Sequence, residues 1–366
     1  MNGNNRPNIN NRNFDTVYRN IWLLGFVLLL IMMVSVGGTT RMTRSGLSIT
    51  EWQPVSGILP PINESDWVEY FEKYKVTPEF QEVNSHFALS DYKKIFFWEY
   101  LHRLLGRVIF FYALIPGLWL WRKKMAEGKL VFALPAMVAL QGLVGWLMVK
   151  SGLKSLPAVS PFMLALHFFM ALATLIVAYY YLSKRRSRLV VQLTKLQKVL
   201  LFILGVLLLF QVFYGCLTSG FRAGLYFCSF PKMGDSYLPD IAMSITPVLN
   251  NFFINPVMIQ WVHRWLGIGV LIIVYLSAIV FIAQSGRQFF RAFIHLISIV
   301  TIQVLSGILL ILWVVPIPLA IFHQFFATLV VLGFCNIIFR IKAPIHCNGG
   351  GRNTEVEAAL DFKLSV

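Results

Sequence analysis

Long apolar runs alternate with short polar segments along most of this chain. Eight runs hold 18 residues or more, and a helix of that length crosses the hydrocarbon core of a bilayer. Pro, Gly and clusters of Lys and Arg separate the runs. The pattern predicts an all-α integral membrane protein with eight transmembrane helices, near Ile21–Gly38, Ile95–Trp121, Val131–Val149, Phe162–Leu182, Val199–Cys216, Val257–Ala283, Phe290–Val315 and Leu319–Arg340.

The composition excludes other classes of protein. Hydrophobic residues make up 57% of the 366 positions and charged residues only 13%, about half the charged share of a soluble domain. This excess excludes an ordinary water-soluble enzyme and a disordered chain. A net charge of +16 would suggest nucleic acid binding in a soluble protein, but in a membrane protein the distribution of the charge predicts orientation.

Basic residues gather on one side of the predicted membrane. The N-terminus, the loops at 122–129, 184–198 and 287–291, and the C-terminal tail with Arg340 before it hold 19 of the 32 basic residues but five of the 16 acidic ones. The positive-inside rule therefore places both termini in the cytoplasm and the large loops Thr39–Lys94 and Leu217–Pro256 outside. The start shows neither a clear cleavage pattern nor the character of a transit peptide, which favours a bacterial inner membrane over a mitochondrial one.

The two halves of the chain repeat one another. Matched motifs are His102-Arg103-x-x-Gly106 with His263-Arg264-x-x-Gly267, Gln141-x-x-x-Gly145 with Gln303-x-x-x-Gly307, Arg44-x-Gly46-Leu47 with Arg222-x-Gly224-Leu225, and His167 with His323. An internal duplication of four spans gives parallel repeats related by a pseudo-twofold axis along the membrane normal.

The repeat sets the predicted domain organisation. It comprises a disordered cytoplasmic tail over 1–20, an N-terminal four-helix bundle over 21–182 that includes the outer loop 39–94, a basic cytoplasmic linker over 183–198, a C-terminal four-helix bundle over 199–340 and a cytoplasmic tail over 341–366.

Four histidines lie at matched depths in the even-numbered spans. His102, His167, His263 and His323 each sit about 6–10 Å below the outer end of a helix. One such histidine could simply make a hydrogen bond between helices, but four at repeated positions indicate a site. Two histidines from facing helices are natural axial ligands of haem iron, whereas zinc would need further ligands nearby.

Charged residues adjoin these histidines. Arg103 and Arg264 directly follow a candidate ligand, and with Arg41, Arg44 and Arg222 they could hold haem propionates or extend to the membrane interface. Glu99 shares a helix face with His102, three residues away, and its counterpart in the second half is the uncharged Gln260. This asymmetry predicts that one half performs chemistry while the other moves or stores electrons. An ion pair between Glu99 and an arginine is the alternative, and both roles can coexist.

Two cysteines bracket the start of the second outer loop. Cys216 and Cys228 could form a disulfide in an oxidising compartment or remain two free thiols. The sequence leaves both alternatives open.

The outer loops carry a family resemblance. The chain resembles the haem A synthases over residues 20–340, in Gly37-Gly38-Thr39-Thr40-Arg41-Met42-Thr43-Arg44-Ser45-Gly46-Leu47-Ser48-Ile49-Thr50-Glu51-Trp52-Gln53-Pro54-Val55-Ser56-Gly57-Ile58-Leu59-Pro60-Pro61, Pro78-Glu79-Phe80, Asn84, Lys94–Arg103, Phe221–Leu225, Pro231–Gly234 and Gln260–Arg264. It lacks the cysteine pair that some members carry in the first outer loop and is similar to the subgroup without it. Cys228 stands where related sequences often have Asn, so the resemblance implies no bridge to Cys216.

The resemblance implies an enzyme that oxidises a methyl group of haem O to a formyl group, through a hydroxymethyl intermediate, to give haem A for cytochrome oxidase. It implies that His102 and His167 bind the substrate haem, that His263 and His323 are the axial ligands of a haem b cofactor, and that Glu99 is the functional glutamate. Implied partners are haem O delivered through the lipid bilayer, the haem O synthase that makes it, and an electron donor or acceptor in the membrane. Whether the protein forms a homo-oligomer is left open.

Two other functions remain as alternatives. A non-catalytic dihaem b-type cytochrome would use the same four histidines to carry electrons. A transporter built from repeats would not need haem, and its broken helices would place polar groups near mid-membrane rather than in a shallow layer of histidines.

Overall fold

The computed structural model describes residues 9–53, 56–153, 157–184 and 189–342. Over these residues the protein is almost entirely helical, and each predicted apolar run forms a long helix. The eight long helices are α1 (Ile9–Met42), α3 (Leu89–Arg122), α4 (Gly128–Gly152), α5 (Pro161–Ser183), α6 (Lys195–Gly220), α8 (Pro256–Ser285), α9 (Phe290–Leu312) and α10 (Ile317–Arg340).

Length and hydropathy pick out seven candidate membrane spans among the described residues. Six coincide with single long helices, and the seventh, Pro256–Leu312, runs through α8 and α9 together. The chain is therefore a multi-pass helical membrane protein. One prediction is wrong: α1 begins at Ile9, so residues 9–20 are helical rather than a disordered tail. Backbone hydrogen bonds continue the helix beyond its apolar segment, which hydropathy does not detect.

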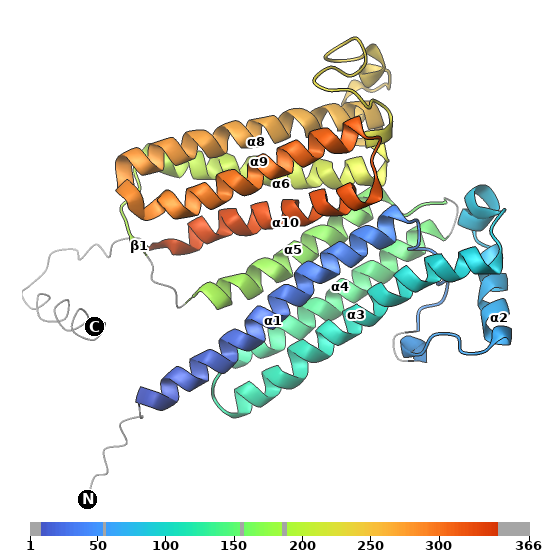
Figure 1. The fold of residues 1–366 in the computed structure, drawn as a ribbon, viewed down its shortest axis with the longest axis horizontal. Coiled ribbons are helices and arrows are strands. Elements are labelled where there is room, and N and C mark those ends of the chain that lie inside the picture. The colour runs from blue at the N-terminus through green and yellow to red at the C-terminus, as the bar shows by residue number, and fades with distance from the viewer. Residues whose placement is uncertain (1–8, 54–55, 154–156, 185–188, 343–366) are drawn as a thin grey trace, which may run out of the picture.

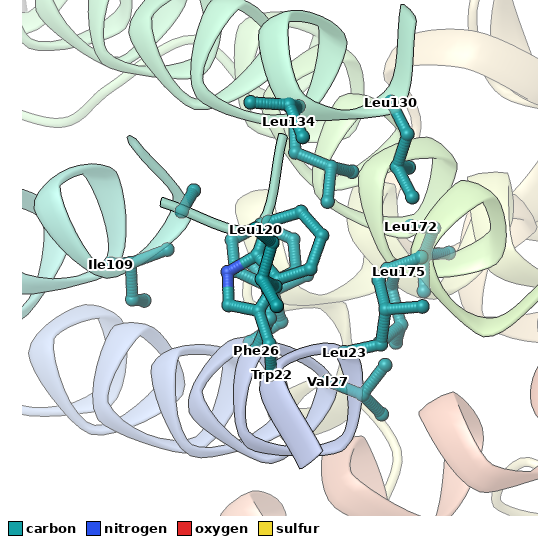
Figure 2. Packing of buried hydrophobic residues seen from close by; sticks show 14 of the residues in the cluster. Trp22, Leu23, Phe26, Val27, Ile109, Leu120, Leu130, Leu134, Leu172 and Leu175 are labelled. Atoms are coloured by element: carbon teal, nitrogen blue, oxygen red, sulfur yellow. The ribbon is translucent and has the colours of Figure 1, made fainter. Parts of the chain in front are cut away.

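The first four long helices pack around one apolar cluster. Trp22 and Phe26 of α1 meet Leu120 of α3, Leu134 of α4 and Leu175 of α5 (Figure 2). The indole N–H of Trp22 also donates to the carbonyl of Tyr112 at 3.1 Å, so the buried ring has its hydrogen-bond partner. In a bilayer, close packing of this kind rather than exclusion of water holds helices together.

The second four long helices pack in the same manner. Phe281 of α8 contacts Phe289, which directly precedes α9, and Phe293 in the first turn of α9, with ring centroids 5.2 and 5.0 Å from that of Phe281. Leu204 of α6 and Val330 of α10 complete this cluster. Helix α10 runs alongside α5 and α1, where the two sets of helices meet (Figure 1).

Short elements connect the long helices. They are η1 (Ser56–Ile58), α2 (Glu64–Lys75), the π-helical turn η2 (Phe80–Asn84), η3 (Ala223–Leu225), η4 (Asp240–Met243), η5 (Val248–Asn250), α7 (Asn251–Ile254), η6 (Gly286–Phe289) and the parallel pair β1 (Leu189–Val190) and β2 (Ile341–Lys342). Helix α2 begins where the Asn63 side chain accepts a hydrogen bond from the Asp66 N–H, and its Phe71 and Tyr74 pack against Tyr92 of α3. The first outer loop is thus folded onto the helix that carries Glu99.

Candidate functional site

A single cavity connects the two halves of the molecule. It has a volume of about 1330 Å³ and is lined by all four intramembrane histidines, His102, His167, His263 and His323. Pockets for drug-sized ligands are about 300–1,000 Å³, so this cavity has room for more than one large apolar ligand. The structure thus brings together the four residues that the repeat singled out.

Each histidine ring lies against a glycine of another helix. An added methyl group would lie 3.2 Å from His102 Nε2 at Gly37, 2.9 Å from His167 Cε1 at Gly145, 3.2 Å from His263 Cε1 at Gly215 and 2.8 Å from His323 Cε1 at Gly307. These distances are shorter than ordinary van der Waals contacts. A larger side chain at any of the four positions would move the ring, so the glycines set where the imidazoles stand.

The histidines of the second half face each other across the cavity. The ring centroids of His263 and His323 are 6.5 Å apart and the rings are nearly perpendicular, at 81°. Two imidazoles that share a metal at about 2.0–2.1 Å from each nitrogen have centroids about 6 Å apart. His323 Nδ1 also lies 2.9 Å from the Ser306 hydroxyl, a contact of the kind that orients metal-binding histidines.

Several buried polar atoms in the cavity wall have no partner within the described residues. They include His167 Nδ1, His263 Nδ1 and the Oε1 atoms of Gln141, Gln211, Gln260 and Gln303. His323 Nε2 is 3.0 Å from the Gln303 amide nitrogen. No group of three or more His, Cys, Asp or Glu residues comes together in the same ranges. Paired imidazoles in a large apolar cavity fit haem and do not fit a zinc centre.

In the first half, Glu99 is held by four donors. Its Oε2 accepts from the Ser48 hydroxyl at 2.8 Å and the Ile49 N–H at 2.7 Å. Its Oε1 accepts from Arg103 Nε at 3.1 Å and Nη2 at 2.7 Å. The ion pair between Glu99 and an arginine, which the sequence offers as an alternative role, is formed with Arg103, and Glu99 also lines the cavity.

The arginines after His102 and His263 hold the outer loops through hydrogen bonds to backbone carbonyls. Arg103 donates to the carbonyls of Ile49 at 2.8 Å and Glu51 at 2.9 Å. Arg264 donates to the carbonyls of Phe227 at 2.6 Å and Ser229 at 2.7 Å.

These loop contacts repeat in the two halves. Phe227 and Ser229 follow Arg222 at the same spacing as Ile49 and Glu51 follow Arg44. The duplication seen in the loop motifs at Arg44 and Arg222 therefore extends to the hydrogen bonds that hold the loops.

The remaining candidate arginines also line the cavity. Arg41 donates to the carbonyls of Ser219 and Gly220 at 2.8 and 3.0 Å, at the C-terminal end of α6, and so joins the two halves. Arg44 and Arg222 both adopt left-handed backbone conformations, with φ of 55° and 53°. Neither side chain makes a hydrogen bond with any described residue. Their guanidinium groups are the ones available to a ligand.

The two cysteines of the second half are not bridged. Cys216 is a buried thiol on α6 that lines the cavity, and Cys228 Sγ lies 3.8 Å from the carbonyl of Gly224. Of the two alternatives that the sequence leaves open, the structure has the two free thiols.

The chain resembles known proteins along most of its length. A family model described as cytochrome oxidase assembly protein (COX15-CtaA) matches residues 20–335. A haem A synthase of Brucella ovis is 38% identical over 324 residues, which cover 86% of this chain and 88% of the relative. A haem A synthase of Brucella anthropi is 36% identical over the same coverage.

Proposed function

The chain belongs to the haem A synthase family, and we propose that it converts haem O to haem A by oxidising one methyl group to a formyl group through a hydroxymethyl intermediate. The product would supply cytochrome oxidase. One observation carries this proposal: the buried carboxylate of Glu99 lies beside only one of the two matched histidine pairs. In a protein that only carried electrons, such a charge would only tune the potential of one haem, whereas beside a reacting group it can stabilise charge that develops there.

We assign the two halves different ligands. His102 and His167, in the four-helix unit of residues 21–182, bind the substrate haem in the half that carries Glu99. His263 and His323, in the unit of residues 199–340, hold haem b. Their centroid separation of 6.5 Å and the cradle of Gly215 and Gly307 support this assignment. Haem b, when bound, supplies one-electron transfer.

The arginines at the outer end of the cavity bind propionates. Arg44 and Arg222 have the strongest support, because they occupy matched positions, line the cavity and have unused donors. Arg41, Arg103 and Arg264 donate hydrogen bonds to backbone carbonyls, and their positive charge adds to that of Arg44 and Arg222.

Glu99 acts as a fixed negative charge. A carboxyl group that accepts from four donors has no free lone pair for a proton in this arrangement. It therefore stabilises positive charge that develops on the methyl carbon during oxidation, rather than carrying protons away from it.

The membrane arrangement completes the proposal. Helices α8 and α9 hold 30 and 23 residues and meet at Gly286, where φ is 70°, so each crosses the bilayer separately and eight spans result. Both termini lie in the cytoplasm of a bacterial cell, and the protein spans the inner membrane. Haem O, made by a haem O synthase, enters the first half from the bilayer with its apolar tail in lipid, and electrons pass to a partner in the membrane.

Expression of the chain beside a source of haem O, followed by pigment extraction and mass analysis, tests the function. We expect haem A and the hydroxymethyl intermediate in addition to bound haem B. Recovery of haem B and haem O alone would support the non-catalytic dihaem cytochrome instead.

A further inference from the structure

A second buried carboxyl group lies in the wall of the cavity. Glu79 follows α2 in the first outer loop, immediately before η2, and is only 4% exposed. Glu51, Glu79 and Glu99 all line the cavity, and all three come from the first half. The described lining residues of the second half include no carboxylate.

The contacts of Glu79 leave one oxygen available. Its Oε2 accepts a hydrogen bond from the Tyr74 hydroxyl at 3.2 Å, and that hydroxyl accepts one from the Asn84 side-chain amide at 2.8 Å. Its Oε1 has no hydrogen-bond partner among the described residues and is accessible to water. Glu79 also takes part in none of the ion pairs of the described chain.

Glu79 and Glu99 therefore differ in what they can do. Both oxygens of Glu99 are filled by fixed donors, whereas Glu79 has one oxygen on which a proton can be placed. Two carboxyl groups in one site with such different surroundings are the usual arrangement for dividing an electrostatic role from an acid–base role.

The charges around Glu79 suit reversible protonation. Burial raises the pKa of Glu79 to about 7, and the negative charge of Glu99 on α3 acts in the same direction. The Tyr74 hydrogen bond from α2, Arg44 after α1 and Arg41 on α1 oppose this rise in pKa.

We propose that Glu79 is the proton acceptor of the substrate cavity, with Tyr74 and Asn84 as the residues that position it. This inference rests on the proposed function. When a methyl group becomes a formyl group, the carbon loses two hydrogens, and each leaves as a proton once its electrons have passed to the oxidant of the reaction. In the assigned step the hydroxymethyl group becomes the formyl group, so one C–H bond and the O–H bond break and the C–O bond becomes a double bond. The two electrons pass, one at a time, to the electron acceptor in the membrane that the proposed function names, and both hydrogens leave as protons. The hydroxyl proton passes through the cavity to Glu79 Oε1, and the carboxylate becomes a neutral acid; the proton from carbon leaves to water.

The test compares the wild type, Glu79→Gln and Glu79→Asp, with Glu82→Gln as the matched control. Glu82 lies in the same segment but is exposed. We expect Glu79→Gln to keep its bound haem while the ratio of formyl to hydroxymethyl product falls by about 10²-fold. Glu79→Asp should restore part of that ratio, and Glu82→Gln should match the wild type.

A readout independent of turnover is the infrared band of a protonated carboxyl group in the purified protein. The wild type and Glu82→Gln should show a band that disappears as the pH rises through about 7, and Glu79→Gln should lack it. An unchanged product ratio in Glu79→Gln, or persistence of the band, would overturn the proposal. Haem A synthesis by the wild type establishes separately whether the function itself holds.

A further variant keeps the proposal testable if Glu79→Gln loses its haem or fails to fold. Tyr74→Phe removes the hydrogen bond that favours the carboxylate, so the midpoint of the infrared titration should move to higher pH. A midpoint that does not move would count against the assignment.

Discussion

The two halves share a scaffold and differ at a position next to the histidine of that scaffold. In both, an arginine one residue after a histidine holds two carbonyls of the outer loop. In the first half the residue four positions before that arginine is Glu99, which accepts from Ser48, Ile49 and Arg103. In the second half it is Gln260, which donates to the carbonyl of Phe227 at 2.9 Å. The scaffold places an imidazole and anchors a loop, and the carboxylate adds a charge to one copy only.

Removing one histidine from each half should separate their functions completely. We expect His102→Ala to make no haem A while keeping haem B, because the second pair is untouched. We expect His263→Ala to lose its haem b absorbance. Absorption spectra and extracted pigments measure both. Equal loss of both haems from either variant would contradict the division of ligands between the halves.

Adding a methyl group at a glycine that contacts a histidine ring should weaken haem binding in that half alone. In Gly145→Ala the new methyl group would press on His167, and in Gly307→Ala on His323. Changes in residues that orient metal ligands typically cost about 10–100-fold in affinity or activity. We expect loss of haem A output from the first variant and loss of haem B from the second.

A neighbouring glycine provides the control. A methyl group at Gly269 on α8 would meet nothing within 4 Å, and Gly269 does not line the cavity. Gly269→Ala should keep both pigments. Equal pigment loss in this control would mean that the helices, rather than the histidine rings, are disturbed.

The smallest effect concerns the pH dependence of stability. The folded-state pKa of Glu79 is raised, so the protonated form is favoured by folding. Its stabilisation is complete below the ordinary carboxyl pKa and is lost as the pH rises through about 7. The side chain of Glu79→Gln stays neutral. The gain in its free energy of unfolding over that of the wild type should reach on the order of 1–3 kcal/mol across this range.

Thermal unfolding in detergent between pH 4.5 and 8 measures that gain. A difference in melting temperature that stays constant with pH would show that Glu79 does not titrate in the folded protein.

The sequence predicted the parts of the structure that follow from local pattern. Apolar length identified the helices, and the duplication identified four histidines that share one cavity. The glycine cradles could have been found in the same way, because Gly37 and Gly215 stand at the same spacing before Arg44 and Arg222.

Other features depend on contacts between distant residues. The clamp of Arg103 on Ile49 and Glu51 requires the outer loop to fold back onto α3, which no local pattern indicates. Glu79 belonged to a family motif, but its burial beside Tyr74 depends on how α2 packs against α3. Apolar length does not predict the extension of α1 to Ile9, because residues 9–20 are mostly polar.

The most direct test of the asymmetry is to exchange the two residues that differ, in Glu99→Gln and in the double variant Glu99→Gln with Gln260→Glu. Pigments extracted from cells that make haem O are then measured by mass. We predict that both variants keep haem B and bound haem O while haem A falls by about 10²–10³-fold, because the carboxylate is needed beside the substrate pair. Haem A at the wild-type level from either variant would contradict the account.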